Sequence, residues 1–202
     1  METKQKPAEK ISLAAGDALL LIDIQKDFLP GGRLAVAEGD QVIPVLNGYI
    51  EQFTHSHLPV FASRDWHPKH HGSFLQQGGT WPEHCTAGSI GAEFARELKL
   101  PADARIISKG IEPEQDGYSA FANTPLQVQL NQLKVSRLFI GGLATDYCVL
   151  NTVRDALSLG YHVLLLTDAV RAVNVHPQEG ETAIREMLHR GAIPITLMMI
   201  RS

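Results

Sequence analysis

The stretch ALLLIDI, residues 18–24, is almost continuous in apolar side chains. A strand with one face in water alternates apolar and polar residues, whereas a strand covered on both faces needs apolar residues at nearly every position. Residues 18–24 therefore predict a strand buried on both faces, which is typical of the middle of a parallel sheet.

Short apolar stretches recur along the chain and predict further strands at Pro59–Ser63, Arg105–Ser108, Arg137–Gly141, His162–Leu166 and Ile193–Leu197. Helical patterns alternate with them, from Asp40 as N-cap to Phe53, from Thr124 as N-cap with Pro125 as first residue, from near Asp146 to Gly160, and over Gln178–Arg190. Strands that alternate with helices favour an α/β fold with a mainly parallel sheet and helices on both faces.

Length and composition suggest one domain and exclude several kinds of partner. The chain has 202 residues, 44% of them hydrophobic, and a net charge of −4. We expect a loosely ordered lead-in over residues 1–16 and a single domain over residues 17–202. The charges are scattered, without the Lys/Arg block that nucleic acid or an anionic membrane requires, and no apolar stretch is long enough to cross a bilayer.

The cysteine content and the N-terminal residues bear on the compartment. Cys85 and Cys148 are too few for a disulfide framework. The first 17 residues lack the apolar centre of a signal peptide. We therefore expect a cytoplasmic protein. The sequence leaves the oligomeric state open, and a homo-oligomer is compatible with it.

Three reactive side chains follow three of the predicted strands. Asp23 ends the first strand, Lys109 follows the third, and Cys148 comes shortly after the fourth. Each one alone is more often structural: a packed cysteine, a capping aspartate or a solvated lysine. The ligand site of a parallel sheet lies at the carboxyl ends of its strands, so these three should meet there. Together they indicate an activated thiol nucleophile.

The expected chemistry of Cys148 depends on the helix that follows the fourth strand. If Thr145 caps this helix, Cys148 lies in its first turn, where free backbone N–H groups and the helix dipole stabilise an anion. A helix N-terminus and a nearby lysine should both lower the thiol pKa. Asp23 could accept the thiol proton, and Lys109 could orient the pair.

A second group of polar residues has the composition of a metal site. Asp65 and His67 follow the second strand two residues apart, and so project to the same side. His84 could supply a third ligand, and His70 or His71 a fourth. One carboxylate with imidazoles suits Zn²⁺, Fe²⁺ or Mn²⁺. On spacing alone, surface histidines in a polar loop are an equally good interpretation. We favour a packed thiol over a ligand for the neighbouring Cys85.

Several segments together resemble the nicotinamidases and pyrazinamidases of the isochorismatase-like cysteine hydrolases. The matching segments occur in the order typical of that family and are DIQKDFLPGGRLAV (23–36), RDWHP (64–68), WPEHC (81–85), KG (109–110), YSAF (118–121) and GLATDYCV (142–149). So many motifs in order make a far more specific match than an isolated Asp-x-His.

The resemblance implies a three-layer fold and a set of catalytic residues. The six-stranded sheet should have the order 3-2-1-4-5-6, and Asp23, Lys109 and Cys148 should form a triad. The peptide bond before Ala144 should be cis. The backbone N–H groups of Ala144 and Cys148 should form the oxyanion hole.

It also implies a metal centre beside a substrate pocket. Asp65, His67 and His84 would be ligands to one divalent ion, with Zn²⁺ first and Fe²⁺ or Mn²⁺ as alternatives. His70, His71 and Ser73 are all candidates for a fourth ligand, and we favour His71. The substrate's pyridine nitrogen would bind at this metal. The ring pocket would be lined by Phe28, Leu34, Trp81 and Tyr118.

The implied activity is that of an amidohydrolase acting on a linear carboxamide C–N bond. Nicotinamide would be hydrolysed to nicotinate and ammonia through a thioester to Cys148, as a step in NAD salvage, and pyrazinamide would react too. One alternative is a related cysteine amidohydrolase that acts on another small amide. A second is a catalytically inactive relative that serves as a binding module, although Asp23, Lys109 and Cys148 are all present.

Overall fold

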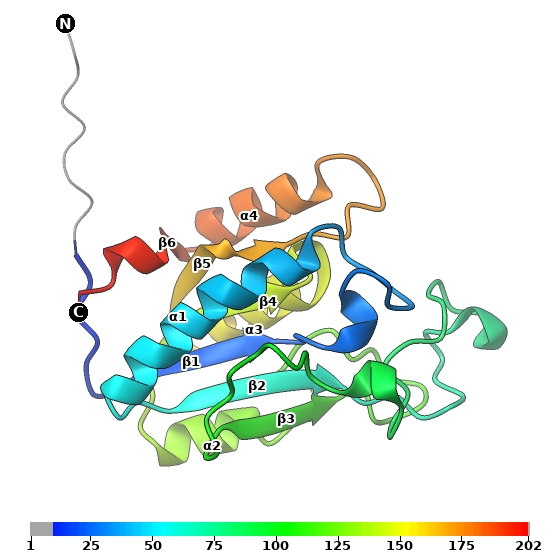
Figure 1. The fold of residues 1–202 in the computed structure, drawn as a ribbon, viewed down its shortest axis with the longest axis horizontal. Coiled ribbons are helices and arrows are strands. Elements are labelled where there is room, and N and C mark those ends of the chain that lie inside the picture. The colour runs from blue at the N-terminus through cyan, green and yellow to red at the C-terminus, as the bar shows by residue number, and fades with distance from the viewer. Residues whose placement is uncertain (1–9, 202) are drawn as a thin grey trace, which may run out of the picture.

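The computed structural model describes residues 10–201 (Figure 1). Its strands are β1 (Asp17–Ile22), β2 (Val60–Asp65), β3 (Arg105–Lys109), β4 (Arg137–Leu143), β5 (His162–Arg171) and β6 (Ile193–Ile195). Its α-helices are α1 (Val42–His55), α2 (Leu126–Gln132), α3 (Leu150–Ser158) and α4 (Glu179–His189). Short turns of other helix types include η1 (Lys26–Phe28) and η5 (Thr145–Val149), and η5 is a π-helical turn.

The strands form one sheet in the order β3-β2-β1-β4-β5-β6. This order confirms the predicted one. All five pairings are parallel, so the sheet is entirely, rather than mainly, parallel. β1 lies at the centre, where Leu20 pairs with Phe61 of β2 and with Ile140 of β4. The carboxyl ends of β1 to β4 therefore share one edge of the sheet.

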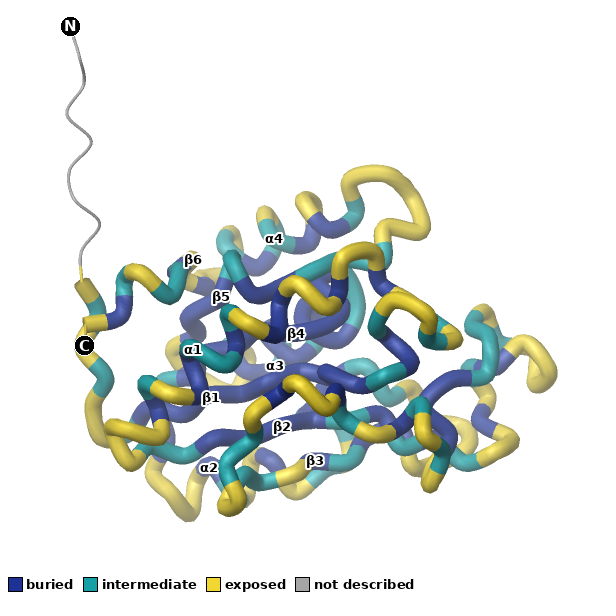
Figure 2. Tube along the Cα trace, in the orientation of Figure 1, coloured by how far each residue is buried: buried dark blue, intermediate teal, exposed yellow. Residues whose placement is uncertain are grey.

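The side chains of β1 alternate between two hydrophobic clusters, one on each face of the sheet. Leu19 and Leu21 pack in the cluster that contains the buried face of α1. Leu20 and Ile22 pack in the cluster that contains the buried residues of α2, α3 and α4. Figure 1 shows α1 on one side of the sheet, and Figure 2 shows that β1 is buried along its whole length. The continuous apolar sequence of β1 is thus explained by burial on both faces.

The structure corrects several predicted boundaries. β1 ends at Ile22 because Asp23, at φ 51°, turns the backbone out of the strand. Asp40 caps no helix, since it lies within a 3₁₀ turn that precedes α1. Pro125 itself occupies the N-cap position of α2, although the Oγ1 of Thr124 accepts a hydrogen bond from the Leu126 N–H at 3.3 Å.

Several strands differ in length from the predicted ones, β5 and β6 among them. β5 extends to Arg171, five residues beyond the predicted end, with a shift of register opposite Gly141. This extension carries the chain toward the site described below. β6 covers only Ile193–Ile195, because Leu197–Met199 form a 3₁₀ turn.

The first described residues lie beside the C-terminal segment. Of the lead-in predicted over residues 1–16, residues 1–9 lie outside the described part of the chain. Ile11 forms a parallel bridge with Ile200, and the Ile11 N–H donates to the Met199 carbonyl at 2.7 Å. Within residues 10–201, no helix is both long enough and apolar enough to span a membrane.

Candidate active site

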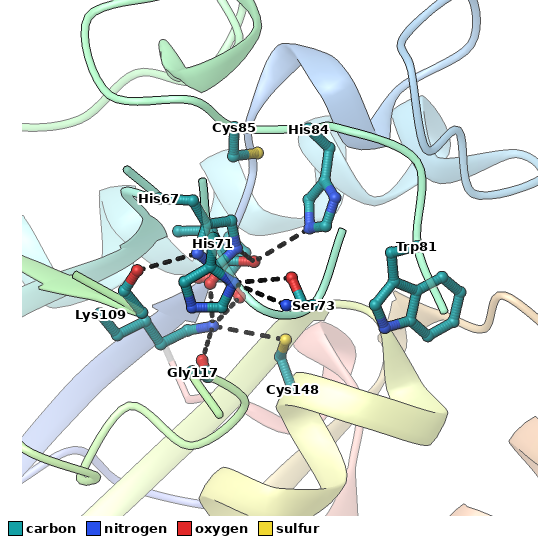
Figure 3. Close-up of polar contacts among 12 residues, drawn as sticks. His67, His71, Ser73, Trp81, His84, Cys85, Lys109, Gly117 and Cys148 are labelled. Atoms are coloured by element: carbon teal, nitrogen blue, oxygen red, sulfur yellow. Dashed lines mark hydrogen bonds and ion pairs between the residues drawn. The ribbon is translucent and has the colours of Figure 1, made fainter. Parts of the chain in front are cut away.

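Four side chains from four neighbouring strand ends converge at the carboxyl edge of the sheet. Figure 3 labels two of them, Lys109 and Cys148, and shows the dashed contact between them. Asp23 follows β1, Asp65 ends β2, Lys109 ends β3, and Cys148 lies in η5 after β4. All four residues are buried. The sheet order places these ends side by side, so the convergence predicted for Asp23, Lys109 and Cys148 is present.

Lys109 contacts each of the other three side chains in this cluster. Its ammonium Nζ lies 2.8 Å from Asp23 Oδ2, 2.5 Å from Asp65 Oδ1 and 3.4 Å from Cys148 Sγ. Nζ also donates a hydrogen bond to the Gly117 carbonyl at 2.7 Å. A buried ammonium requires this many partners, because an unpaired charge in the interior is very costly. The lysine can therefore stabilise negative charge on either carboxylate or on the thiol sulfur.

Asp23 has one occupied and one available carboxylate oxygen. Its Oδ1 accepts a hydrogen bond from Ser63 Oγ at 2.7 Å. Its Oδ2 is buried and, within residues 10–201, accepts no well-directed hydrogen bond, although Lys109 Nζ is close. A carboxylate oxygen of Asp23 and Cys148 Sγ lie within 4.8 Å of each other. Oδ2 is thus free to accept a proton from the thiol.

The pKa of the Cys148 thiol differs from the sequence-based prediction. Burial raises this pKa well above its usual value, and the nearby Lys109 opposes the rise without cancelling it. Burial also raises the pKa of Asp23, again against the influence of Lys109. The prediction of a lowered pKa for the Cys148 thiol is therefore wrong. A buried carboxylate with a raised pKa is, however, a suitable partner for such a thiol, because the proton affinities of the two groups approach each other.

The turn that carries Cys148 has an unusual backbone. The Leu143–Ala144 peptide bond is cis, as the resemblance implied. Gly142, just before it, has φ 128°, and a Cβ there would lie 2.2 Å from the Ile22 carbonyl oxygen, so only glycine fits beside β1. Ala144, rather than Thr145, occupies the N-cap position of η5, and no side chain caps this turn. Among the described residues, the Ala144 N–H has no intramolecular acceptor.

Asp65, His67 and His84 form a group that could hold a metal ion. One ligand atom from each lies within 4.8 Å of the other two, and all three residues are buried. Asp65 Oδ2 is 3.4 Å from His67 Nε2 and 3.9 Å from His84 Nε2. Burial and the neighbouring His67 lower the pKa of His84, which favours the neutral imidazole that binds metals.

Backbone carbonyls fix the orientation of both imidazoles. His67 Nδ1 lies 2.9 Å from the Gly110 carbonyl oxygen, and His84 Nδ1 lies 2.7 Å from that of Pro82. A carbonyl can only accept, so each Nδ1 carries the proton and each Nε2 presents a lone pair toward Asp65. Such a second hydrogen bond is typical of metal-binding histidines. The residues present therefore fit a divalent cation.

None of the three candidates for a fourth ligand joins this group. His70 is exposed. His71 is buried, but its Nε2 donates to the Gln115 carbonyl at 3.1 Å and its Nδ1 lies 2.7 Å from Ser73 Oγ. Both ring nitrogens of His71 are thus already used, and its ring lies 4.1 Å from that of His67. Ser73 lines the adjacent pocket, and its Oγ contacts His71.

A pocket of about 500 Å³, including its open mouth, connects the two groups. Its walls contain the four predicted residues, Phe28, Leu34, Trp81 and Tyr118, together with Asp65, His67, His84, Ala144 and Cys148. The Trp81 indole N–H donates to the Tyr118 hydroxyl at 2.9 Å, which joins two aromatic walls. The pocket size suits a small aromatic ligand.

Sequence reasoning missed several residues that build the site. Tyr147 and Val173 line the pocket. Gln25 holds both backbone groups of Asp65, since its Oε1 accepts from the Asp65 N–H at 2.7 Å and its Nε2 donates to the carbonyl at 2.8 Å. Gln25 and Ser63 could have been noticed as polar residues beside or within buried strands. Tyr147 and Val173 carry no such signal.

Cys85 is a packed thiol, as we favoured. Its exposed fraction is 0%, it belongs to the hydrophobic cluster on the α1 face, and it is not part of the metal-ligand group. Burial raises its pKa. Its backbone N–H donates to Asp27 Oδ2 at 2.7 Å, which fixes the turn that carries His84.

Fold and site together define the class of cysteine hydrolases that are built on a parallel sheet with helices on both faces. Within this class the chain belongs to the isochorismatase family, since the Isochorismatase domain matches residues 17–198. The chain is 42% identical to a nicotinamidase of Escherichia coli (strain K12), over 89% of this chain and 94% of that protein.

Two solved structures extend this comparison. A pyrazinamidase of Pyrococcus horikoshii, in complex with zinc, has a TM-score of 0.86 and 45% identity, and the match covers 90% of this chain and 99% of that one. PnC1 from L. infantum, in complex with nicotinate, has a TM-score of 0.87 and 32% identity, with 95% and 98% covered.

Proposed function

We propose that this protein is a nicotinamidase that hydrolyses nicotinamide to nicotinate and ammonia. The observation that carries the proposal is the position of Asp65, which contacts Lys109 through one oxygen and faces His67 and His84 with the other. The thiol and the metal-ligand group thus lie on the same small pocket. The names of the E. coli and P. horikoshii relatives support this substrate class.

The pocket would hold the substrate's ring between aromatic walls. Phe28, Trp81 and Tyr118 offer faces and edges to a planar ring, and Leu34 adds an apolar contact. A divalent cation held by Asp65, His67 and His84 would act as a Lewis acid that binds the pyridine nitrogen and orients the ring. The carboxamide carbon would then face Cys148 Sγ on the opposite wall.

The first chemical step is the attack of Cys148 on the carboxamide. Asp23 takes the thiol proton on Oδ2 as Sγ forms a bond to the carbonyl carbon, and the electron pair of the C=O bond moves to oxygen. Lys109, close to both Sγ and Asp23, stabilises the negative charge as it moves between them. The backbone N–H groups of Ala144 and Cys148 would bind the oxyanion.

The second step releases ammonia, and the third releases nicotinate. The protonated Asp23 gives its proton to the amide nitrogen as the C–N bond breaks, which leaves a thioester on Cys148. Asp23, again a carboxylate, removes a proton from a water that attacks the thioester. The C–S bond breaks, and the proton returns from Asp23 to the sulfur. The raised pKa of Asp23 suits a group that must both accept and donate a proton.

The proposal has further parts. Pyrazinamide keeps the ring nitrogen and the carboxamide and should also react. Zinc is our first choice of metal, supported by the zinc in the P. horikoshii structure, and Fe²⁺ and Mn²⁺ suit the same ligands. Conversion of nicotinamide to nicotinate belongs to NAD salvage, and the two free cysteines suit a cytoplasmic location.

Ammonia release from nicotinamide by the purified, zinc-loaded protein tests the proposal. Cys148→Ala should abolish release, and Cys85→Ala, which replaces the packed thiol, serves as the matched control. A profile of other small amides tests the alternative, a related amidohydrolase with a different substrate. Wild-type protein that hydrolyses another amide but not nicotinamide would establish that alternative. Bound zinc should fall in Asp65→Ala and His67→Ala, and unchanged zinc in both would refute the ligand set.

A further inference from the structure

One stretch of backbone, Gly110–Ala120, serves several active-site side chains at once. The Gly110 carbonyl accepts from His67 Nδ1 at 2.9 Å, and the Gly117 carbonyl accepts from Lys109 Nζ at 2.7 Å. Within the same stretch, the Tyr118 hydroxyl accepts from the Trp81 indole and lines the pocket. A metal ligand, the catalytic lysine and the aromatic wall therefore all depend on where this segment lies.

Close backbone packing fixes the first part of the Gly110–Ala120 segment. A Cβ on Gly117 would lie 2.6 Å from the Gly110 Cα, and a Cβ on Gly110 would lie 2.4 Å from His67 Cε1. The two glycines thus pack directly against each other beside the imidazole. This packing holds the segment near His67 but does not reach its far end.

Two side chains bind the far end, where Thr124 Oγ1 donates a hydrogen bond to the Ala120 carbonyl and only Thr152, of these two, belongs to the element that carries Cys148. The Ala120 N–H donates a hydrogen bond to Thr152 Oγ1 at 3.0 Å, and both residues have an exposed fraction of 0%. Thr152 lies in α3, one turn beyond Cys148 along the same continuous helical stretch. The bond therefore ties the segment that supports Lys109 and Tyr118 to the element that carries the thiol.

We propose that Thr152 is a positioning residue for the reaction: its hydroxyl oxygen fixes Gly117 and Tyr118 relative to Cys148. A buried N–H without an acceptor is strongly unfavourable, so loss of this oxygen should move Ala120 toward another partner or water. The Gly117 carbonyl and Tyr118 lie three and two residues away and would move with it. Thr152 itself lines no part of the pocket.

Thr152→Val tests this, because valine keeps the shape of threonine and removes the oxygen. We expect kcat to fall because the shifted Gly117 carbonyl no longer holds Lys109 in place. We expect KM to rise because Tyr118 moves in the pocket wall. Together these changes should reduce kcat/KM about tenfold, the effect of one lost buried hydrogen bond. Thr152→Ser keeps the oxygen, and its kcat and KM should match those of wild type. Thr182→Val, an exposed position on α4, should match wild type. The kinetic part of the test rests on the proposed function.

Hydrogen exchange followed by mass spectrometry needs no substrate and separates the two proposals. Peptides covering 117–121 should exchange faster in Thr152→Val and at the wild-type rate in Thr152→Ser. Should wild type release no ammonia, the proposed function fails, while the exchange result still decides the role of Thr152. Wild-type exchange together with wild-type kcat and KM in Thr152→Val would overturn the inference, even if its melting temperature is lower. If Thr152→Val does not fold, Thr152→Ala compared with Thr152→Ser isolates the same oxygen.

Discussion

Asp65 and Lys109 form a buried ion pair, with 2.5 Å between Oδ1 and Nζ, that joins the cluster of Asp23, Lys109 and Cys148 to His67 and His84. Burial alone would raise the pKa of Asp65, but Lys109 and then His67 lower it well below its usual value. The carboxylate is therefore ionised at neutral pH and neutralises part of the lysine's charge whether or not a cation is bound.

Asp65→Asn should accordingly lower the free energy of unfolding more than a substitution of the proposed ligand His84. Removal of one partner of a buried ion pair costs about 3–5 kcal/mol of stability. His84→Asn leaves the Asp65–Lys109 pair intact and should cost much less. Both variants should lose zinc. Urea unfolding with a chelator present would measure the difference without any contribution from metal, and equal stabilities would contradict the proposed link.

Ser63→Ala should shift the pH dependence of activity. Burial is the main cause of the raised Asp23 pKa, while Lys109 and the Ser63 hydrogen bond lower it. Without the Ser63 hydroxyl the pKa of Asp23 should rise further. The base form of Asp23 would then appear only at higher pH, so the acidic limb of the kcat/KM profile should move upward. The exposed Ser158→Ala is the control, and a shift in the opposite direction would refute Asp23 as the base.

Gly110→Ala should weaken metal binding through steric conflict. Gly110 has φ 62°, and its added Cβ would lie 2.6 Å from His67 Nδ1. Gly160 also has a positive φ, 88°, but a Cβ there would meet nothing within 4 Å. Both alanines should cost about 1 kcal/mol from backbone strain, whereas only Gly110→Ala should lower zinc affinity. Competition with a chromogenic chelator measures this, and equal affinities in the two variants would show that His67 tolerates the methyl group.

Glu186 should contribute a small, pH-dependent part of the stability. Hydrogen bonds from Arg154 and then Arg190 lower its pKa to about 2. The carboxylate is partly exposed, so its ion pairs should contribute about 1 kcal/mol or less. A carboxylate with a depressed folded-state pKa stabilises fully above its unfolded pKa, about 4.3, and loses that contribution as the pH falls toward 2.

The measurement is urea unfolding of wild type and Glu186→Gln. Wild type should have the higher free energy of unfolding at pH 7. The difference between wild type and Glu186→Gln should become smaller between pH 5 and pH 3. Glu181→Gln, whose 3.7 Å contact with Arg185 is more exposed, should show almost no gap at any pH. A Glu186→Gln gap that widens toward acid pH would contradict the assignment.

The central strand β1 was predictable because burial on both faces leaves a continuous apolar sequence. The residues at which the helices begin were less predictable. At Asp40 a good capping residue is present, but a 3₁₀ turn comes first, and this depends on tertiary packing rather than on local preference. The end of β1 could not be seen because the left-handed conformation of Asp23 is imposed by the site that it serves.

The site residues with distinctive chemistry were predictable, and their supporting partners were not. Asp23, Lys109 and Cys148 stand at strand ends, where the sheet brings them together. The contributions of Gly117 and Pro82 come from carbonyl groups, which every residue has, so no sequence pattern marks them. The pKa of Cys148 was predicted in the wrong direction because the sequence gives no measure of how deeply the sulfur is buried.

The central place of β1 in the sheet also has a consequence for synthesis on the ribosome. β1 is made first among the strands, yet one of its two neighbours, β4, emerges only after β2, β3 and α2. Until β4 docks, Asp23 and Lys109 have no sulfur beside them, and one edge of a very apolar strand stays open. A nascent chain therefore carries no assembled nucleophile, and its most aggregation-prone stretch awaits a partner that is translated late. Assembly of Asp23, Lys109 and Cys148 thus depends on the docking of β4 rather than on the completion of any local element.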